Sequence, residues 1–231
     1  MSELLVLFDI DGTLLHAKGA GVGGFVKAGQ RVFGADFSLD GIPVGGQLDP
    51  LILHRALERI GMDPHEVNLQ AFRNHYRECL ADLFESGDRT SDALPGVHEL
   101  LDALGACPTI DIGLLTGNIA ETAALKLSAA GISMDHFLVA AWGDEGEMRS
   151  DLPPVALERW MNHHGIEREF EHSIIIGDTI HDVHCGKANG CRVLAVCTGG
   201  VDRSDLEQAG ADLVVDDLSN VTMLVDWIRQ S

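Results

Sequence analysis

Residues 4–16 read LLVLFDIDGTLLH, an apolar run that passes directly into two carboxylates, Asp9 and Asp11, and then into Gly12. An uninterrupted apolar run of this length is typical of a strand that is buried on both faces, as in parallel sheets. Open parallel sheets bind ligands beyond the carboxyl ends of their strands. We therefore expect Asp9 and Asp11 at a ligand-binding edge, although Asp-Gly taken alone is also a signal for a hairpin turn.

The composition is that of an acidic globular chain. Of its 231 residues, 45% are hydrophobic and 23% are charged, and the formal net charge is -20. A field of this sign opposes polyanions, so we expect neither nucleic acid nor a membrane surface as a partner. A phosphate-bearing ligand would need local positive charge. Nothing in the sequence indicates the oligomeric state.

Two features bear on the cellular compartment. The first residues, MSELLVLF, contain no basic leader, and their apolar run is too short for a secretory signal or a membrane span, so we expect a cytoplasmic protein. The five cysteines form no C-x-x-C pair, which predicts reduced core thiols in place of disulfides or a zinc site.

Beyond the first strand, apolar runs alternate with helix-like segments. The runs occupy residues 109–115, 136–140, 173–177, 192–196 and 211–215. Short strands that alternate with helices predict an α/β fold with a doubly wound parallel sheet. The helix-like segments end on Gly131 and Gly165, as many helices do.

An insertion interrupts this alternation. The interval between the first strand and residue 109 is about three times the roughly 30 residues of one strand-helix-strand unit. It contains helix-like segments at residues 25–33, 49–60 and 64–85, the second with Asp49 as its expected N-cap. We predict two domains: a small helical cap domain of residues 17–92, and a core domain of residues 1–16 and 93–231.

The insertion opens with GAGVGG, in which Gly19, Gly21 and Gly24 match the G-x-G-x-x-G pattern of dinucleotide-binding folds, with Asp40 further along. That fingerprint needs its first glycine directly at the end of the strand, where the backbone meets the pyrophosphate. Carboxylates hold that place here. We therefore expect no dinucleotide and interpret the glycines as a flexible hinge between the two predicted domains.

The carboxylates of Asp9 and Asp11 lie two residues apart, so on a strand they point to the same side. Two carboxylates that close repel each other. Either one of them keeps its proton or a divalent cation neutralises the pair.

Two later strand ends carry further polar groups. Thr116, Gly117 and Asn118 offer a hydroxyl and two amides where a strand passes into a helix, a position that favours an anion, although a simple helix cap would look the same. Asp178 follows another apolar run, and Asp182 lies one helical turn later. We expect all these groups at one edge of the sheet.

These residues resemble the motifs of the haloacid dehalogenase (HAD) superfamily of hydrolases. Its first motif, D-x-D-G-T, matches residues 9–13 residue for residue. Its second motif, a Thr or Ser after an apolar strand, falls on Thr116, and its fourth, often G-D-x-x-x-D, falls on residues 177–182. The match extends along most of the chain. The helical insertion lies where phosphatases of the superfamily that are similar to phosphoglycolate phosphatase carry a small cap.

The resemblance implies a magnesium-dependent phosphatase that acts on a small phosphorylated metabolite. Asp9 would be the nucleophile that forms an aspartyl-phosphate, and Asp11 would protonate the leaving oxygen and then activate water. Magnesium would bind the Asp9 carboxylate, the Asp11 backbone carbonyl and Asp178. Asp182 would support these metal ligands.

The resemblance also implies groups that bind the phosphoryl oxygens, namely Thr116 with the amides of Gly117 and Asn118. The third motif departs from the family pattern, because its lysine, commonly in K-P-x-P, is missing from GEMRSDLPPVALERW. Arg149 is the nearest cation, and we expect it to replace the lysine in substrate binding. Lys187 in HCGKANG is the second candidate.

The roles of several polar residues stay open. Gln47 and Asp49 of GGQLDP resemble a stretch that often faces the core in capped members of the superfamily, which leaves contact with the substrate undecided. His181 lies inside the fourth motif, and His184 could share its helix face. Magnesium prefers oxygen ligands, so we expect no second metal site built from these histidines.

Alternative functions also stay open. Haloacid dehalogenases lack the second Asp of the first motif, so Asp11 argues against dehalogenation. A phosphonatase usually needs a cap lysine for a Schiff base, and Lys18 and Lys27 lie near the predicted hinge. The main alternative is a phosphomutase of the sugar-phosphate class, and a catalytically silent phosphate-binding protein is a weaker one. The sequence does not identify the substrate.

Overall fold

A computed structural model describes residues 3–64 and 67–230. Its strands are β1 (Leu4–Phe8), β2 (Leu15–His16), β3 (Asp92–Ala93), β4 (Ile110–Leu115), β5 (Val139–Ala141), β6 (Ser173–Gly177), β7 (Arg192–Val196) and β8 (Leu213–Val215). Its α-helices are α1 (Ala20–Phe33), α2 (Asp49–Arg59), α3 (Leu69–Glu85), α4 (Val97–Gly105), α5 (Ala120–Ala129), α6 (Leu152–His164), α7 (Ile180–Ala188), α8 (Arg203–Ala209) and α9 (Val221–Arg229).

Six strands form a parallel sheet in the order β5-β4-β1-β6-β7-β8. The central strand β1 pairs with β4 on one side and β6 on the other, and all five of its residues are buried. Val6 and Phe8 pack into the core on one face of the sheet, and Leu5 and Leu7 pack into the core on the other. Burial on both faces accounts for the uninterrupted apolar run, and the predicted doubly wound parallel sheet is confirmed.

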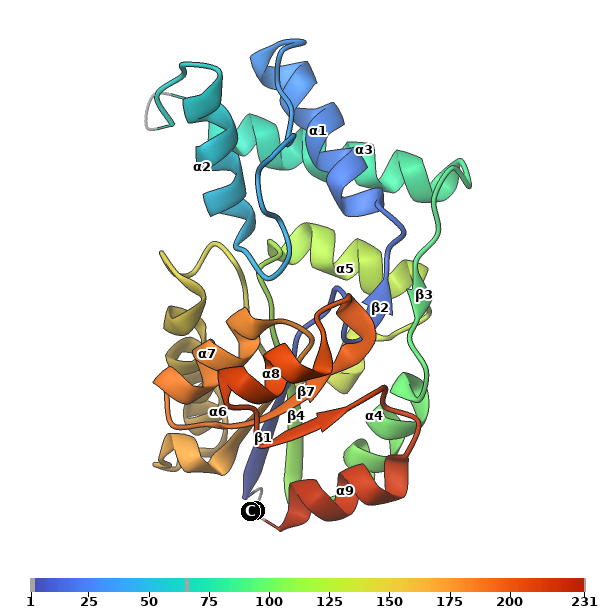
Figure 1. Cartoon of the computed structure of the whole chain (residues 1–231), viewed down its shortest axis with the longest axis vertical. Coiled ribbons are helices and arrows are strands. Elements are labelled where there is room, and N and C mark those ends of the chain that lie inside the picture. Colours follow the sequence, from blue (N-terminus) through green and yellow to red (C-terminus); the bar gives the residue numbers. More distant parts are fainter. Residues whose placement is uncertain (1–2, 65–66, 231) are drawn as a thin grey trace.

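Helices cover both faces of this sheet. Helices α4, α5 and α9 share one hydrophobic core with it, and helices α6, α7 and α8 pack on the opposite face (Figure 1). One strand differs from the prediction: β5 begins at Val139, within the predicted run 136–140. Ser133 caps a 3₁₀ turn over Met134–His136, which holds the first part of that run out of the sheet.

Helices α1, α2 and α3 form the insertion and lie beyond the carboxyl ends of the sheet strands (Figure 1). They have an aromatic core of their own, in which the ring centroid of Phe25 lies 4.8 Å from that of Phe72 and 5.1 Å from that of Tyr76. The short antiparallel pair of β2 and β3 holds the two chain segments that enter and leave the insertion. The domain boundaries at residues 17 and 92 stay a prediction.

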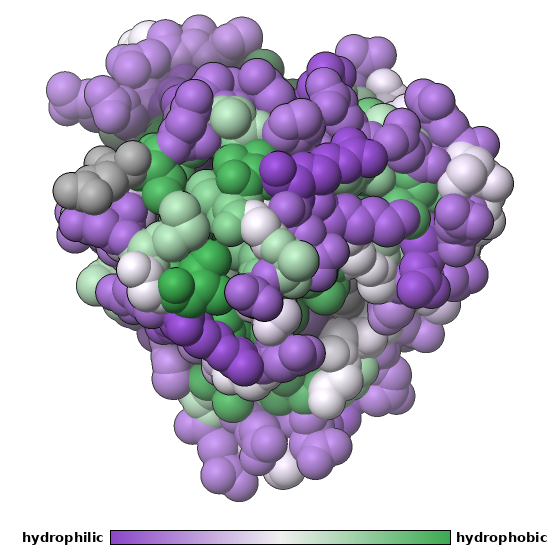
Figure 2. All heavy atoms as spheres, turned by 90° about the horizontal axis from the view of Figure 1, so that it is seen from above, coloured by the Kyte–Doolittle hydropathy of each residue, from purple (hydrophilic) through white to green (hydrophobic). Residues whose placement is uncertain are grey.

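On the face of the molecule seen from above, apolar residues are visible among hydrophilic ones (Figure 2).

The starts of two inserted helices differ from the predicted starts. Helix α3 begins at Leu69 with Asn68 as its N-cap, later than the predicted start at residue 64, and residues 65–66 of that prediction lie outside the described residues. Asp49 is the first residue of α2, and Leu48 holds the N-cap position, so the predicted N-cap was wrong by one residue.

The prediction of a flexible hinge over GAGVGG is wrong for most of that stretch. The chain turns at Lys18 and Gly19, which have φ values of 45° and 79°. Gly21 and Gly24 lie inside helix α1. A Cβ on Gly24 would lie 3.3 Å from the backbone nitrogen of Leu80 in α3. Gly24 therefore allows α1 and α3 to pack closely, and the helical conformation of both glycines differs from the predicted hinge.

Two further predictions concern the cysteines and the cellular compartment. All five cysteines are free, and four of them are buried. Among the described residues, no helix has the length and apolar character needed to cross a membrane. The cytoplasmic location stays a prediction.

Helix α1 allows a test of this close packing. Gly29→Ala should lower the free energy of unfolding by about 1–3 kcal/mol, because the new Cβ would overlap the ring of the buried Phe37. Gly23→Ala in the same helix is the matched control. Its Cβ would meet only Leu83 Cδ1, at 3.6 Å, so helix propensity should raise the stability by up to about 1 kcal/mol. Urea unfolding measures both, and stabilisation by both substitutions would contradict the packing of Phe37 against α1.

Candidate active site

The carboxyl ends of β1, β4 and β6 bring the predicted site residues together. The backbone extends the sheet pattern past the strands, since Asp9 N donates to Ile176 O at 2.9 Å. A cavity of about 470 Å³ opens between these strand ends and the inserted helices. Of the residues predicted from the motifs, those that line it are Asp9, Asp11, Thr116, Gly117, Asn118, Arg149 and Asp178.

A tight turn after β1 orients the first motif. The Ile10 carbonyl accepts hydrogen bonds from the amides of Leu14 and Leu15, and Gly12 has a φ of 86°. A Cβ at Gly12 would overlap the carboxylate of Asp178. Because β1 pairs with β4 and β6 while β2 pairs with β3, this Asp-Gly turn is not the hairpin that the dipeptide alone allowed. The turn brings the first and fourth motifs into contact.

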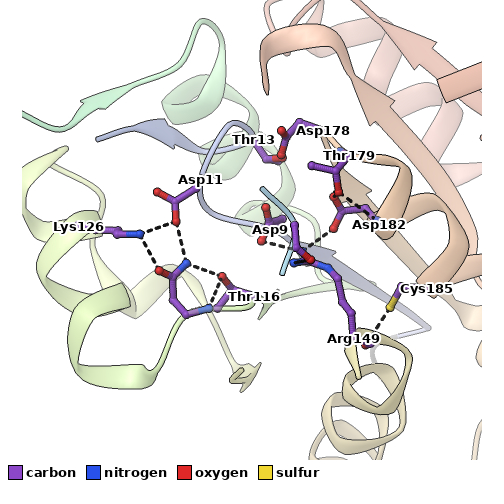
Figure 3. A network of polar contacts seen from close by, with 12 residues as sticks. Asp9, Asp11, Thr13, Thr116, Lys126, Arg149, Asp178, Thr179, Asp182 and Cys185 are labelled. Atoms are coloured by element: carbon purple, nitrogen blue, oxygen red, sulfur yellow. Dashed lines mark hydrogen bonds and ion pairs between the residues drawn. The ribbon is translucent and has the colours of Figure 1, made fainter. Parts of the chain in front are cut away.

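Arg149 lies between two buried carboxylates (Figure 3). Its Nη2 atom lies 2.8 Å from Asp9 Oδ1 and 2.5 Å from Asp182 Oδ1, and its Nη1 atom donates to the carbonyl of Gly46 at 3.2 Å. Burial alone lowers the pKa of Arg149, but Asp182 and Asp9 outweigh it and raise the pKa above its ordinary value. The guanidinium thus remains charged and neutralises part of this acidic cluster.

Two carboxyl groups of the cluster, Asp9 and Asp178, have raised pKa values. Burial raises the pKa of Asp9 to about 6, with Arg149 opposing the shift and Asp182 adding to it. Burial, together with the charges of Asp9 and Asp182, raises the pKa of Asp178 to about 8, although Thr13 Oγ1 donates a hydrogen bond to Asp178 Oδ1 at 3.0 Å. Arg149 alone does not offset the negative charge gathered here.

This cluster fits a divalent metal ion. Asp9, Asp178 and Asp182 are all buried, and each offers a carboxylate oxygen within 4.8 Å of the others. Oxygen donors with mutual repulsion suit a hard cation such as Mg²⁺. Asp182 Oδ2 also accepts from the Thr179 amide and hydroxyl at 3.0 and 2.6 Å. With Arg149 on its other oxygen, Asp182 is better suited to support the site than to bind the metal itself.

Asp11 has a different cation as its partner. Lys126 Nζ lies 2.6 Å from Asp11 Oδ2 and 2.6 Å from Asn118 Oδ1. Asn118 Nδ2 donates to the same Asp11 oxygen at 2.8 Å and to Thr116 Oγ1 at 2.8 Å. The two carboxylates of the first motif are thus each paired with a side-chain cation, a solution to their repulsion that the sequence reasoning did not consider (Figure 3).

Lys126 is the site residue that the sequence reasoning missed. It lies on helix α5, on the buried face that also carries Thr122, Ala123 and Leu127. A lysine on the buried face of a helix is rare without a charged partner, because desolvation of its ammonium is costly. That position in ETAALKLSA was the available signal.

The two candidates for the missing lysine occupy different environments. Arg149 is buried and contacts Asp9, whereas Lys187 bonds Asp212 at 2.5 Å, where both side chains are 36% exposed. These positions favour Arg149 as the cation next to the predicted nucleophile, Asp9. Its role in substrate binding stays a prediction.

The loop before α2 lies directly on the loop after β4. Asp49 N donates to the Gly117 carbonyl at 2.7 Å, and Ile119 N donates to Asp49 Oδ2 at 3.2 Å. A Cβ on Gly117 would overlap the carbonyl of Gln47, so only glycine fits there. Burial raises the pKa of Asp49 to about 6, although Lys126 opposes the shift. Asp49 therefore connects the inserted helices to the predicted phosphate-binding loop.

His181 of the fourth motif and His184 after it are not part of the acidic cluster. His181 Nε2 is 2.8 Å from Gln47 Nε2, and Arg55 donates to Gln47 Oε1 at 3.2 Å, at the exposed rim of the cavity. His184 is exposed. Gln47 of the insertion thus contacts His181 of α7, and its contact with substrate stays undecided.

Comparison with known proteins agrees with this geometry. The family model described as haloacid dehalogenase-like hydrolase matches residues 6–196. Pyrophosphatase PpaX of Oceanobacillus iheyensis is 22% identical over 97% of this chain and 98% of its own length. Phosphoglycolate phosphatase of Rhodospirillum rubrum is 27% identical over 96% of this chain and 90% of its own length.

Solved structures share the fold along nearly all of the chain. CbbY from Rhodobacter sphaeroides in complex with phosphate has a TM-score of 0.72 at 20% identity, with 96% of each chain covered. A hydrolase from Pseudomonas syringae has a TM-score of 0.69 at 22% identity, with 98% of this chain and 99% of that chain covered. These similarities show that the sheet and the inserted helices follow a known arrangement.

The raised pKa values of Asp9 and Asp178 predict that, without a divalent cation, the stability of the folded chain decreases as the pH rises. A carboxyl with a raised pKa binds its proton more tightly in the folded chain, so its contribution to stability is complete below the ordinary value of 3.8. That contribution is lost as the pH rises through about 6 for Asp9 and about 8 for Asp178. In chelator, the melting temperature should therefore fall between about pH 5 and about pH 9, and Mg²⁺ should restore it most at the higher pH.

Thermal unfolding with Asp178→Asn as the control measures this effect. The neutral amide has no proton to lose, so the variant should show a smaller fall with pH and a smaller response to Mg²⁺. A change of 1 kcal/mol corresponds to about 2–4 °C in a chain of this size, which is easily resolved. Equal stabilisation by Mg²⁺ at about pH 5 and at about pH 9 would contradict a site formed by these carboxylates.

Proposed function

The chain belongs to the haloacid dehalogenase-like hydrolases, and from this membership we propose that it is a magnesium-dependent phosphatase for a small phosphorylated metabolite, which reacts through an aspartyl-phosphate on Asp9. The observation that carries the proposal is the buried Asp9 carboxylate, which lines a cavity and lies next to a guanidinium and a second acidic residue suited to a metal. The names of the relatives, phosphoglycolate phosphatase and pyrophosphatase, support the same class of reaction.

In the proposed reaction, an Asp9 oxygen attacks phosphorus and the ester P–O bond breaks, while Asp11 gives its proton to the leaving oxygen. Water then attacks the aspartyl-phosphate, its proton passes to Asp11, and the Asp9 carboxylate is released with inorganic phosphate. Mg²⁺ held by Asp9, the Asp11 backbone carbonyl and Asp178 would offset the repulsion between an anionic nucleophile and a phosphate dianion.

The loop after β4 is proposed to bind the phosphoryl oxygens. Thr116 Oγ1 accepts hydrogen bonds from the amide and the side chain of Asn118, which leaves the hydroxyl proton of Thr116 to donate to a phosphoryl oxygen. The start of helix α5 lies next to this loop and adds the favourable field of a helix N-terminus.

The cavity supports a small substrate. Its volume is about 470 Å³, and the side contributed by the insertion includes Phe25, Leu39 and Ile52. Such a lining suits an organic group of a few carbon atoms beyond the phosphate better than a polymer. The proposal therefore keeps to small phosphorylated metabolites.

Release of inorganic phosphate from a panel of phosphorylated metabolites tests the function. We expect Mg²⁺-dependent release from at least one member, no release in excess chelator, and at least about 10³-fold slower release with Asp9→Asn, which lacks the nucleophile. Conversion of a hexose 1-phosphate to another hexose phosphate would favour a phosphomutase. Binding without release across the panel would favour a silent phosphate-binding protein.

Intact-mass spectrometry tests the covalent step in the same experiment. Asp11→Asn keeps the nucleophile and loses an acid and base function worth about 10²- to 10⁴-fold in rate. With a substrate whose leaving group needs little protonation, this variant should accumulate a phosphoryl adduct on Asp9. An adduct on the Asp9→Asn protein, or on another residue of the Asp11→Asn protein, would refute the assignment.

A separate prediction concerns the cation of the third motif. Arg149→Ala should lower kcat/KM by about 10²-fold or more, because it removes the buried charge next to Asp9, and Arg149→Lys should restore part of the rate. Lys187→Ala is the control and should have little effect, since its ammonium bonds Asp212. Unchanged turnover in Arg149→Ala with a loss in Lys187→Ala would reverse the two roles.

A further inference from the structure

Lys126 is a buried cation whose ammonium bonds two residues of the candidate active site. Its side chain is only 5% exposed, yet it lines the cavity. Its ammonium bonds Asp11 Oδ2 and Asn118 Oδ1, and Asn118 Nδ2 bonds the same oxygen of Asp11. The three side chains form a closed triangle of charge-assisted hydrogen bonds, which are stronger than neutral ones.

The inserted helices leave room for this lysine. A Cβ on Gly21 of α1 would lie 3.0 Å from Lys126 Nζ and 3.7 Å from the hydroxyl of Tyr76, which is in α3. Any larger residue at position 21 would crowd the ammonium. Gly21, one of the glycines of GAGVGG, therefore permits the approach of α1 to Lys126, which gives that glycine a specific place in the site.

Asp11 needs such support because of where it lies. Its side chain is 43% exposed. The residue lies after β1 in a turn that contains Gly12, whose φ is 86°. A partly exposed carboxylate on a short side chain would sample several rotamers if nothing restrained it. Lys126 and Asn118 both hold Oδ2, so among the described residues Oδ1 is left as the oxygen that can exchange a proton with a substrate.

We propose that Lys126 is a positioning residue for Asp11: with Asn118, it holds the carboxylate so that Oδ1 faces the leaving oxygen of the substrate. The inference rests on the proposed phosphatase function. When the P–O bond of the substrate breaks, the Asp11 Oδ1–H bond breaks with it and the proton passes to the leaving oxygen. Lys126 takes no part in bond making and contributes by restricting the acid to a productive orientation.

The experiment compares two substrates on the same sample of each variant. An alkyl phosphate needs a proton on its leaving alkoxide, whereas p-nitrophenyl phosphate needs little help from an acid. Lys126→Met should lower kcat/KM by about 10²-fold for the alkyl ester and by only a few-fold for the aryl ester. The kcat/KM for the alkyl ester divided by that for the aryl ester should therefore fall by about 30-fold or more. The folded fraction of the sample cancels from this ratio.

Matched variants separate positioning from a structural role. Lys126→Arg keeps a cation and should recover part of the ratio. Lys187 bonds Asp212, away from Asp11, so Lys187→Met should leave the ratio at the wild-type value. In an Asp11→Asn background, Lys126→Met should change the ratio by less than about 2-fold, since the acid it positions is already gone. Should Lys126→Met not fold, Lys126→Gln removes the charge, keeps a hydrogen-bond donor and should show the same direction of change.

Three results would overturn the inference. Equal losses on both substrates would mean that Lys126 supports only the structure. A raised KM with unchanged kcat would mean that it binds the phosphoryl group. A fall of the ratio in the Asp11→Asn background as large as in the wild type would mean that it acts without Asp11. If the wild-type protein hydrolyses neither ester, nor any metabolite of the panel, the proposed function fails and the inference fails with it.

Discussion

The repulsion between carboxylates gathered at the ends of adjacent parallel strands is the constraint on which the rest of the site depends. Asp9 follows the central strand, Asp178 follows its neighbour, and Asp182 lies one helical turn further on, all of them buried. Their burial and mutual charge raise the pKa of Asp178 to about 8. A fold that keeps such groups out of water must supply positive charge at short range.

Two cations supply this charge, and both lie between the sheet and the inserted helices. Arg149, just before α6, contacts Asp9 and Asp182 and also donates to the carbonyl of Gly46 in the loop that leads to α2. Lys126 on α5 contacts Asp11 and lies close to Gly21 of α1. The inserted segment therefore bonds one of the two cations directly and lies close to the other.

The sequence predicted the sheet and the polar strand ends because both depend on local patterns. The apolar run before Asp9 and the runs before Thr116 and Asp178 each identify a buried strand with a polar residue at its end. Lys126 was not predicted, because its partner Asp11 is separated from it by 115 positions in the chain, and its place on the buried face of a helix was the one local signal. The prediction for the glycines of α1 was wrong for the same reason: Gly24 faces Leu80 and Gly21 faces Lys126, and both neighbours lie in other helices.

The charge count also explains why the proposed chemistry calls for a metal. Arg149 and Lys126 each already bond carboxylates, so much of their positive charge is balanced before a phosphate dianion approaches a protein whose net charge is -20. The amides beyond β4 add only partial positive charge. Two cations against Asp9, Asp11, Asp178 and Asp182 leave an excess of negative charge when all four are ionised, and a divalent ion would balance it. In this view the ion makes the ionised nucleophile and the anionic substrate compatible in one cavity, while Arg149 and Lys126 hold the carboxylates in place.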